Sequence, residues 1–165
     1  MDEILLRLMH IPRGLRVTNE QLWKLLSGVD PGLVFEFSAY FRERPLWREE
    51  SLRELEDCSV RNVNWSRVGS TDYPRGWLGL SERPAVFHYR GRPRWQDSNF
   101  IAIVGSRTPL IETRLWLQRE LSQFLRVSSA GVVSGGARGV DSVAHRICLD
   151  EGLPTLCVLP SGVLN

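Results

Sequence analysis

The sequence has few cysteines and no long apolar run. Its three cysteines, Cys58, Cys148 and Cys157, are odd in number and scattered, which argues against a disulfide-bonded scaffold or a zinc site. Cys148 and Cys157 fall in apolar segments and are expected to be small buried residues in a reducing cytosol.

No apolar run approaches the roughly 20 residues of a membrane helix, and the acidic start at Asp2 and Glu3 is unlike a secretory signal. The composition, 42% hydrophobic and 24% charged, is that of an ordinary globular protein.

Two nucleotide-binding motifs are also missing. The pattern G-x-x-x-x-G-K-[ST], whose lysine holds nucleotide phosphates, does not occur, and Lys24 is the single lysine of the chain. The pattern G-x-G-x-x-G, which binds dinucleotides after a first strand, does not occur either. These absences disfavour a nucleoside-triphosphate motor and an ordinary nicotinamide-dependent dehydrogenase.

The scarcity of lysine leaves arginine as nearly the only basic residue. Because Lys24 is the one lysine among 21 basic residues, the other 20 are arginine, and the net charge is +2. Arginine suits bidentate phosphate contacts and stacking on bases, although codon usage in a GC-rich genome explains it equally well. The three arginines from Arg90 to Arg94 interleave with Tyr89 and Trp95. This cluster is typical of contact with single-stranded DNA, and a solvated linker is the alternative.

A glycine-rich segment at residues 134–145 is the most informative part of the sequence. It follows an apolar run at 131–133, part of a predicted strand at 131–134, and leads into a helical pattern at 140–150. Glycines let the backbone turn and approach a ligand, and a helix N-terminus attracts anions. We expect Arg138 to lie buried inside this turn, where its forked charge suits phosphate. The residues predicted to contact phosphate here are Ser134, Gly135, Gly136, Arg138 and Gly139. The alternative is that the glycines only permit tight packing of strand and helix.

A second loop of similar design lies upstream. The apolar run 100–104 predicts a parallel strand covered on both faces, and residues 110–126 follow a helical pattern. Gly105, Ser106 and Arg107 therefore lie at the carboxyl end of a strand, where open α/β sheets bind ligands. If the two strands are neighbours, the two loops converge on one crevice.

No catalytic set emerges from the residue pattern. Asp141 and His145 are four residues apart and share one helix face beside the Arg138 turn. An acid and an imidazole near a phosphate site could in principle hydrolyse a substrate. More simply, Asp141 favours the helix N-terminus and orients Arg138 or loop amides, and His145 hydrogen-bonds within the same loops. We therefore assign both residues a supporting role and predict neither catalysis nor a metal site.

The chain is expected to contain two domains. Four helical patterns predict a small helical domain over residues 1–62. They lie at residues 3–10, at 18–26, from Pro31 to before Pro45, and at 46–57. We expect a strand at 86–89, at the edge of a sheet. It precedes strands at 100–104, 131–134 and 155–159, and these three are separated by helices. This order predicts an α/β fold with a right-handed parallel βαβαβ sheet, a partial Rossmann-like domain over residues 63–165. Because the pattern stops at its third long strand without a covering helix, we expect a truncated C-terminus.

These motifs resemble the DNA-processing protein A family, also called Smf. The resemblance rests on Ile103-Val-Gly-Ser-Arg107 and on Ser134-Gly-Gly-Ala-Arg-Gly-Val-Asp141 with Ala144-His145. Weaker matches are Tyr73-Pro74, the segment 83–91, and Thr155-Leu-Cys-Val-Leu-Pro-Ser-Gly162. The resemblance covers about residues 65–165, and the first sixty residues match loosely, as a small domain similar to a sterile-alpha-motif module.

The resemblance implies a cytoplasmic bacterial protein that binds single-stranded DNA independently of sequence. Members of the family protect incoming DNA in natural transformation and help to load the RecA recombinase, and the full-length protein is expected to be a homodimer. Their fold is an extended Rossmann-like domain without a nucleotide cofactor. Their DNA lies in a basic pocket that includes the arginine at the position of Arg107 and the second glycine-rich loop. The chain departs from the family at Gly136, where leucine is common, and the family's fold continues beyond the position of Asn165.

Two other classes of function remain open. Nucleoside-phosphate phosphoribohydrolases also bind phosphate over glycine-rich turns, but they carry a Pro-Gly-Gly-x-Gly-Thr…Glu pattern that has no counterpart here. A protein-interaction module, with the helical N-terminus recruiting a partner, is the third class.

Overall fold

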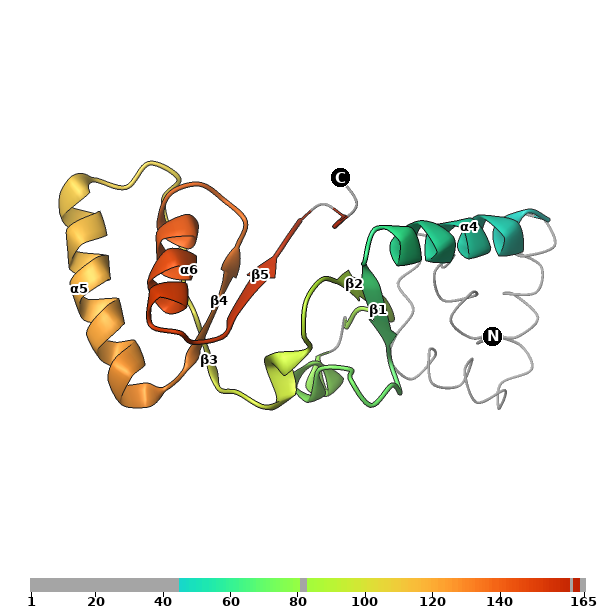
Figure 1. The fold of residues 1–165 in the computed structure, drawn as a ribbon, viewed down its shortest axis with the longest axis horizontal. Helices are drawn as coiled ribbons and strands as arrows, with labels where there is room; N and C mark the ends of the chain where they lie inside the picture. Colours follow the sequence, from blue (N-terminus) through green and yellow to red (C-terminus); the bar gives the residue numbers. More distant parts are fainter. Residues whose placement is uncertain (1–44, 81–82, 161, 164–165) are drawn as a thin grey trace. The chain divides into compact units, whose positions relative to one another are not determined.

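The computed structural model describes residues 45–80, 83–160 and 162–163. The three helices expected before residue 45 lie outside these ranges. The chain divides into two compact units at Gly91 and Arg92, and each is described by itself (Figure 1). The boundary predicted after residue 62 stays a prediction.

In the first unit, helix α4 spans Trp47–Val60 and confirms the helix expected at 46–57. Its C-terminus is closed by two backbone hydrogen bonds, from Asn62 N–H to Ser59 O at 3.2 Å and from Val63 N–H to Cys58 O at 2.8 Å. Asn62 has a φ of 53°, which asparagine tolerates better than most residues. This left-handed residue ends the helix and turns the chain into a strand.

The rest of the first unit is a two-stranded antiparallel sheet with its own small core. Strand β1 (Asn64–Arg67) pairs with β2 (Val86–Tyr89), and the short 3-10 helix η1 (Arg75–Gly79) lies between them. Tyr73 is buried, contacts the rings of Trp77 and Phe87 edge-on at 5.9 Å, and donates its hydroxyl hydrogen to Pro84 O at 2.6 Å. The strand expected at 86–89 therefore forms, but it pairs with β1 rather than with the parallel strands, because its aromatic face packs against this local cluster.

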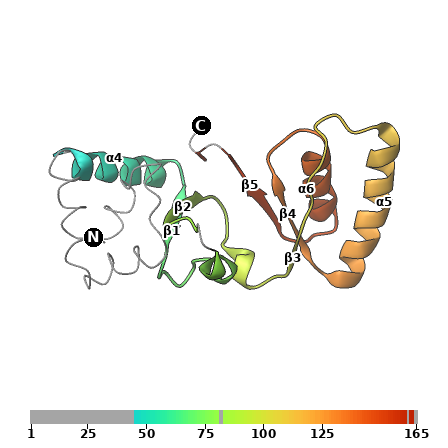
Figure 2. The same cartoon turned by 180° about the vertical axis from the view of Figure 1, so that it is seen from behind.

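The second unit confirms the parallel βαβαβ arrangement. Strands β3, β4 and β5 lie in that order and are all parallel, with Ile101 opposite Val132 and Val133 opposite Leu156 (Figures 1 and 2). The elements of this unit are η2 (Arg94–Gln96), β3 (Phe100–Ala102), α5 (Ile111–Ser128), β4 (Gly131–Gly135), α6 (Val140–Asp150) and β5 (Thr155–Val158). Neighbouring strands joined by helices bring the ends of β3 and β4 to the same edge of the sheet.

The core of the second unit lies between the two helices and the sheet. The buried residues that form it are Leu117, Leu121, Leu125, Val132, Val140, Ala144, Ile147 and Cys148. At the far end of α6, Glu151 accepts two hydrogen bonds from Arg126, at 2.8 and 2.9 Å, and so ties α5 to α6. The expectation that Cys157 is buried is wrong. Cys157 is exposed, because no described element covers the end of β5. Among the described residues, no helix combines the length and the apolar character that crossing a membrane requires.

Candidate functional site

The first loop of the candidate site joins β3 to α5. Gly105, Ser106 and Arg107 are all exposed there, as the sequence predicts for the end of a strand. Ser106 Oγ accepts a hydrogen bond from Thr108 N–H at 3.1 Å, which bends the loop locally. Because α5 begins at Ile111, Pro109 lies in the loop before the helix.

The second loop joins β4 to α6 and contains the glycine-rich segment. Ser134 is buried in β4, and its hydroxyl donates a hydrogen bond to Ile103 O at 2.6 Å. Its side chain thus links the ends of β3 and β4, directly below the two loops. Gly136 and Arg138 are exposed. The expectation that Arg138 is buried inside the turn is therefore wrong, because the residue precedes the helix and lies outside its packed face.

The two loops are in direct contact through their backbones. Val140 N–H donates to Ser106 O at 3.0 Å, so the start of α6 is bonded to the first loop. Gly139 has a φ of +94°, and a Cβ at this position would collide with the carbonyl oxygens of Ser106 and Arg107. A Cβ on Gly105 would lie 2.8 Å from Val140 Cγ2. The predicted convergence of the loops is confirmed, and Gly105 and Gly139 have a packing role in it.

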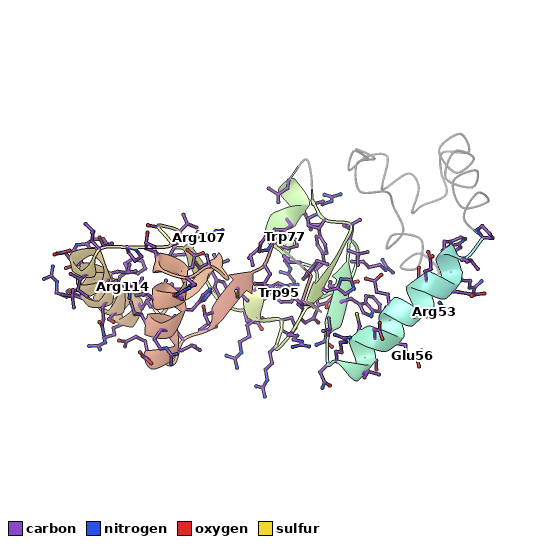
Figure 3. All side chains as sticks on the ribbon, turned by 90° about the horizontal axis from the view of Figure 1, so that it is seen from above. Arg53, Glu56, Trp77, Trp95, Arg107 and Arg114 are labelled. Atoms are coloured by element: carbon purple, nitrogen blue, oxygen red, sulfur yellow. The ribbon has the colours of Figure 1, made fainter. Side chains whose placement is uncertain are left out.

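Two arginines project from these connected loops. Arg107 and Arg138 are exposed, and within the described ranges neither side chain forms an ion pair or a hydrogen bond. Figure 3 shows Arg107 on the loop that precedes α5 and Arg114 farther along, on the helix itself. Unpaired guanidinium groups retain all their donors for a ligand with several acceptor oxygens.

The supporting residues predicted from the sequence both lie next to the second loop. Asp141, in the first turn of α6, is 8% exposed, and a Cβ on Gly135 would lie 2.6 Å from its Oδ2. His145 contacts Thr155 Oγ1 through Nδ1, at 2.6 Å, and Gly135 O through Nε2, at 3.0 Å. Thr155 was not predicted, because its proximity to His145 depends on the register of β4 and β5.

The arrangement offers little for acid–base or nucleophilic catalysis. Loss of water around the sulfur, and then the Asp141 carboxylate, raise the pKa of the Cys157 thiol, which keeps it protonated near neutral pH. The ring nitrogens of His145 both have partners within the fold. In the described part of the chain, no group of three or more acidic, histidine or cysteine residues could hold a metal ion.

A cavity of about 590 Å³ lies beside the first loop. No ionisable side chain lines it; its walls are Ala102, Ile103, Val104, Gly105, Ser106, Thr108, Pro109, Leu110, Thr113, Trp116, Leu117 and Val140. The cavity is therefore largely apolar, and the charged groups lie outside it on the loops.

Comparison with known proteins matches the part of the chain that contains both loops. A family model described as DNA recombination-mediator protein A matches residues 65–165, which include both loops. Protein Smf of Synechocystis sp. is 34% identical over 113 residues, covering 66% of this chain and 28% of that protein. Protein Smf of Borreliella burgdorferi is 30% identical over 100 residues, covering 59% of this chain and 31% of that protein. The chain thus spans less than a third of the curated relatives that it matches.

A solved structure shares the fold. The X-ray structure of DNA processing protein A from Streptococcus pneumoniae is similar with a TM-score of 0.63 and 23% identity. The match covers 94% of this chain and 56% of that one. Because the family model covers more than half of the sequence, the chain belongs to the DNA recombination-mediator protein A family.

Proposed function

We propose that the chain binds single-stranded DNA through phosphate contacts at the two connected loops. The observation that carries this proposal is the pair of exposed arginines, Arg107 and Arg138, on loops whose backbones are bonded to each other. A rigid loop pair with two free guanidinium groups suits the closely spaced phosphates of a nucleic-acid strand. The proposed contact residues are Gly105, Ser106, Arg107, Ser134, Gly135, Gly136, Arg138 and Gly139, with Asp141 and His145 in support.

Binding is proposed to be independent of base sequence. Side chains that read base edges are mostly arginine, asparagine, glutamine and acids placed in a groove, whereas phosphate contacts carry no sequence information. The two loops hold no aromatic or amide side chain. Their serine, glycine and arginine residues are suited to phosphate oxygens.

The proposed cellular role draws on membership of the family. Membership supports a part in DNA processing during recombination, and we propose that this part is assistance to RecA loading during natural transformation in the cytoplasm. A homodimer of the full-length protein belongs to the same proposal. We further propose that the protein acts by binding and not as an enzyme. Both ring nitrogens of His145 have partners within the fold, and the raised pKa of the Cys157 thiol disfavours the reactive thiolate. Release of a free base from nucleoside monophosphates would contradict a purely binding role and favour a phosphoribohydrolase.

The test compares Arg107→Ala with Arg92→Ala. Arg92 is exposed and belongs to the 90–94 cluster, so its loss changes the charge equally without touching the loops. Fluorescence anisotropy with a mixed-sequence oligonucleotide, over a series of salt concentrations, gives the affinity and its salt dependence. Arg107→Ala should weaken binding more, and should reduce the slope of log K against log salt by about 0.7 for each lost phosphate contact.

One outcome of this comparison would contradict the proposed binding site. Equal losses from Arg107→Ala and Arg92→Ala would indicate diffuse attraction by net charge, and the two loops would then not form a specific site. Circular dichroism spectra of both variants serve as the control that the fold is unchanged.

A further inference from the structure

His145 connects the glycine-rich loop to the neighbouring strand. Its Nε2 lies 3.0 Å from Gly135 O, the last carbonyl of β4 before the loop, and its Nδ1 lies 2.6 Å from Thr155 Oγ1 at the start of β5. The Thr155 hydroxyl is also 3.1 Å from Val132 O. One half-buried imidazole therefore takes part in a chain of three hydrogen bonds across β4, α6 and β5.

The hydrogen atoms available for these three hydrogen bonds can be counted. A carbonyl oxygen only accepts, so Nε2 must carry a hydrogen to bond Gly135 O. In the neutral ring Nδ1 then has none and must accept the single hydroxyl hydrogen of Thr155, which the hydrogen bond from Thr155 to Val132 O also uses. In the doubly protonated ring Nδ1 donates to Thr155, and the hydroxyl hydrogen is free for Val132 O. All three hydrogen bonds are complete only when His145 is protonated.

Few charged groups face this imidazole among the described residues. On its own helix, Asp141 lies one turn earlier; on β5, Cys157 follows Thr155 on the same face, and β4 contributes only Ser134 and Gly135. The Arg126–Glu151 ion pair joins α5 to the opposite end of α6. A proton on His145 thus adds a positive charge beneath the loop that offsets the negative charge of Asp141.

We propose that His145 is a positioning residue that fixes the glycine-rich loop for an anionic ligand, and that protonation of its ring strengthens phosphate binding. The protonated ring makes a charge-assisted hydrogen bond to Gly135 O, and such bonds are stronger than neutral ones. It also brings a positive charge close to the loop. The effect on DNA rests on the proposed function, whereas the effect on the loop does not.

The first experiment needs no DNA. Nitrogen-15 NMR of the full chain follows Nδ1 and Nε2 of His145 between pH 8 and pH 5, the range in which histidine changes charge. Nε2 should carry a hydrogen throughout, and Nδ1 should gain one as the pH falls. The amide signals of Gly136 and Gly139 should shift together with Nδ1 and should stop shifting in His145→Gln. Loop amides that do not follow Nδ1 would overturn the proposal.

The second experiment measures affinity for a mixed-sequence single strand at pH 8 and pH 5. The wild-type gain on acidification should exceed that of His145→Gln by about fivefold, the size expected when a neutral hydrogen bond becomes charge-assisted. Glutamine keeps a donor for Gly135 O but does not titrate. His88→Gln is the matched control, since His88 lies in the first unit beside Glu54, and it should keep the wild-type gain.

The outcomes separate the two proposals. An equal gain in wild type and His145→Gln would refute the protonation effect while leaving DNA binding intact. A chain that binds no single strand at either pH would refute the proposed function, and the NMR titration would still decide whether His145 controls the loop.

Discussion

Replacing Gly139 with alanine should destabilise the second unit and separate the two loops. Gly139 has a φ of +94° and a ψ of −130°, a conformation that costs a residue with a Cβ on the order of 1–3 kcal/mol. The added Cβ would also overlap the carbonyl oxygens of Ser106 and Arg107. Because backbone atoms must move to relieve this overlap, a further cost of roughly 1–3 kcal/mol is expected. The free energy of unfolding should therefore fall by about 2–6 kcal/mol, the sum of these two costs.

Gly152→Ala is the matched control for this prediction. Gly152 also has a positive φ, of +70°, but a Cβ there would have no atom within 4 Å. Its replacement should cost only the backbone strain, about 1–2 kcal/mol. Urea denaturation followed by circular dichroism measures both variants, and loss of the folding transition in Gly139→Ala is the upper end of the expected range. If Gly139→Ala costs no more than Gly152→Ala, the loops are not in contact and the reasoning is refuted.

Three further predictions concern DNA, pH and thiol chemistry. A single strand should displace a bound labelled strand at lower concentration than a duplex of the same sequence at moderate salt, because a flexible strand can bring its phosphates to both loops whereas a stiff duplex cannot adapt. Equal competition would contradict the loop site. Arg126 lowers the pKa of Glu151, so the stability from this pair is present above the ordinary glutamate pKa of about 4.3 and is lost as the pH falls through the lower folded value. Melting temperatures should accordingly show Glu151→Gln slightly less stable than wild type at pH 7, with the difference shrinking as the pH falls below about 4. Mass spectrometry after iodoacetamide treatment should find Cys157 labelled first and faster at high pH, with Cys58 and Cys148 labelled only after unfolding, since both are buried.

The sequence was sufficient to predict the second unit and the meeting of its loops. The apolar runs and the glycines that interrupt them locate β3, β4, β5 and the two helices to within a few residues. The convergence of Gly105–Arg107 with the glycine-rich loop follows from topology alone, because neighbouring parallel strands end at one edge.

Features that depend on tertiary contacts were predicted less well. The helical pattern at 110–126 does not decide which apolar residues are buried, and in the structure the buried residues of α5 are Leu117, Leu121 and Leu125. Adjacent apolar residues such as Phe124 and Leu125 differ by only 100° around a helix, so packing against α6 selects between them. Thr155 as a partner of His145, and the exposure of Cys157, depend likewise on the register and coverage of β5.

The packing role of the glycines and a phosphate-binding role are not alternatives. The contacts that connect the loops use main-chain atoms, Val140 N–H with Ser106 O, and a buried serine, Ser134. None of them uses an arginine, so the loops are fixed in place while Arg107 and Arg138 keep their charge and donors for a ligand. A fixed site loses less free energy on ordering when it binds. Folded Gly139→Ala protein should therefore bind DNA more weakly although both arginines remain, whereas attraction by net charge alone would leave its affinity unchanged.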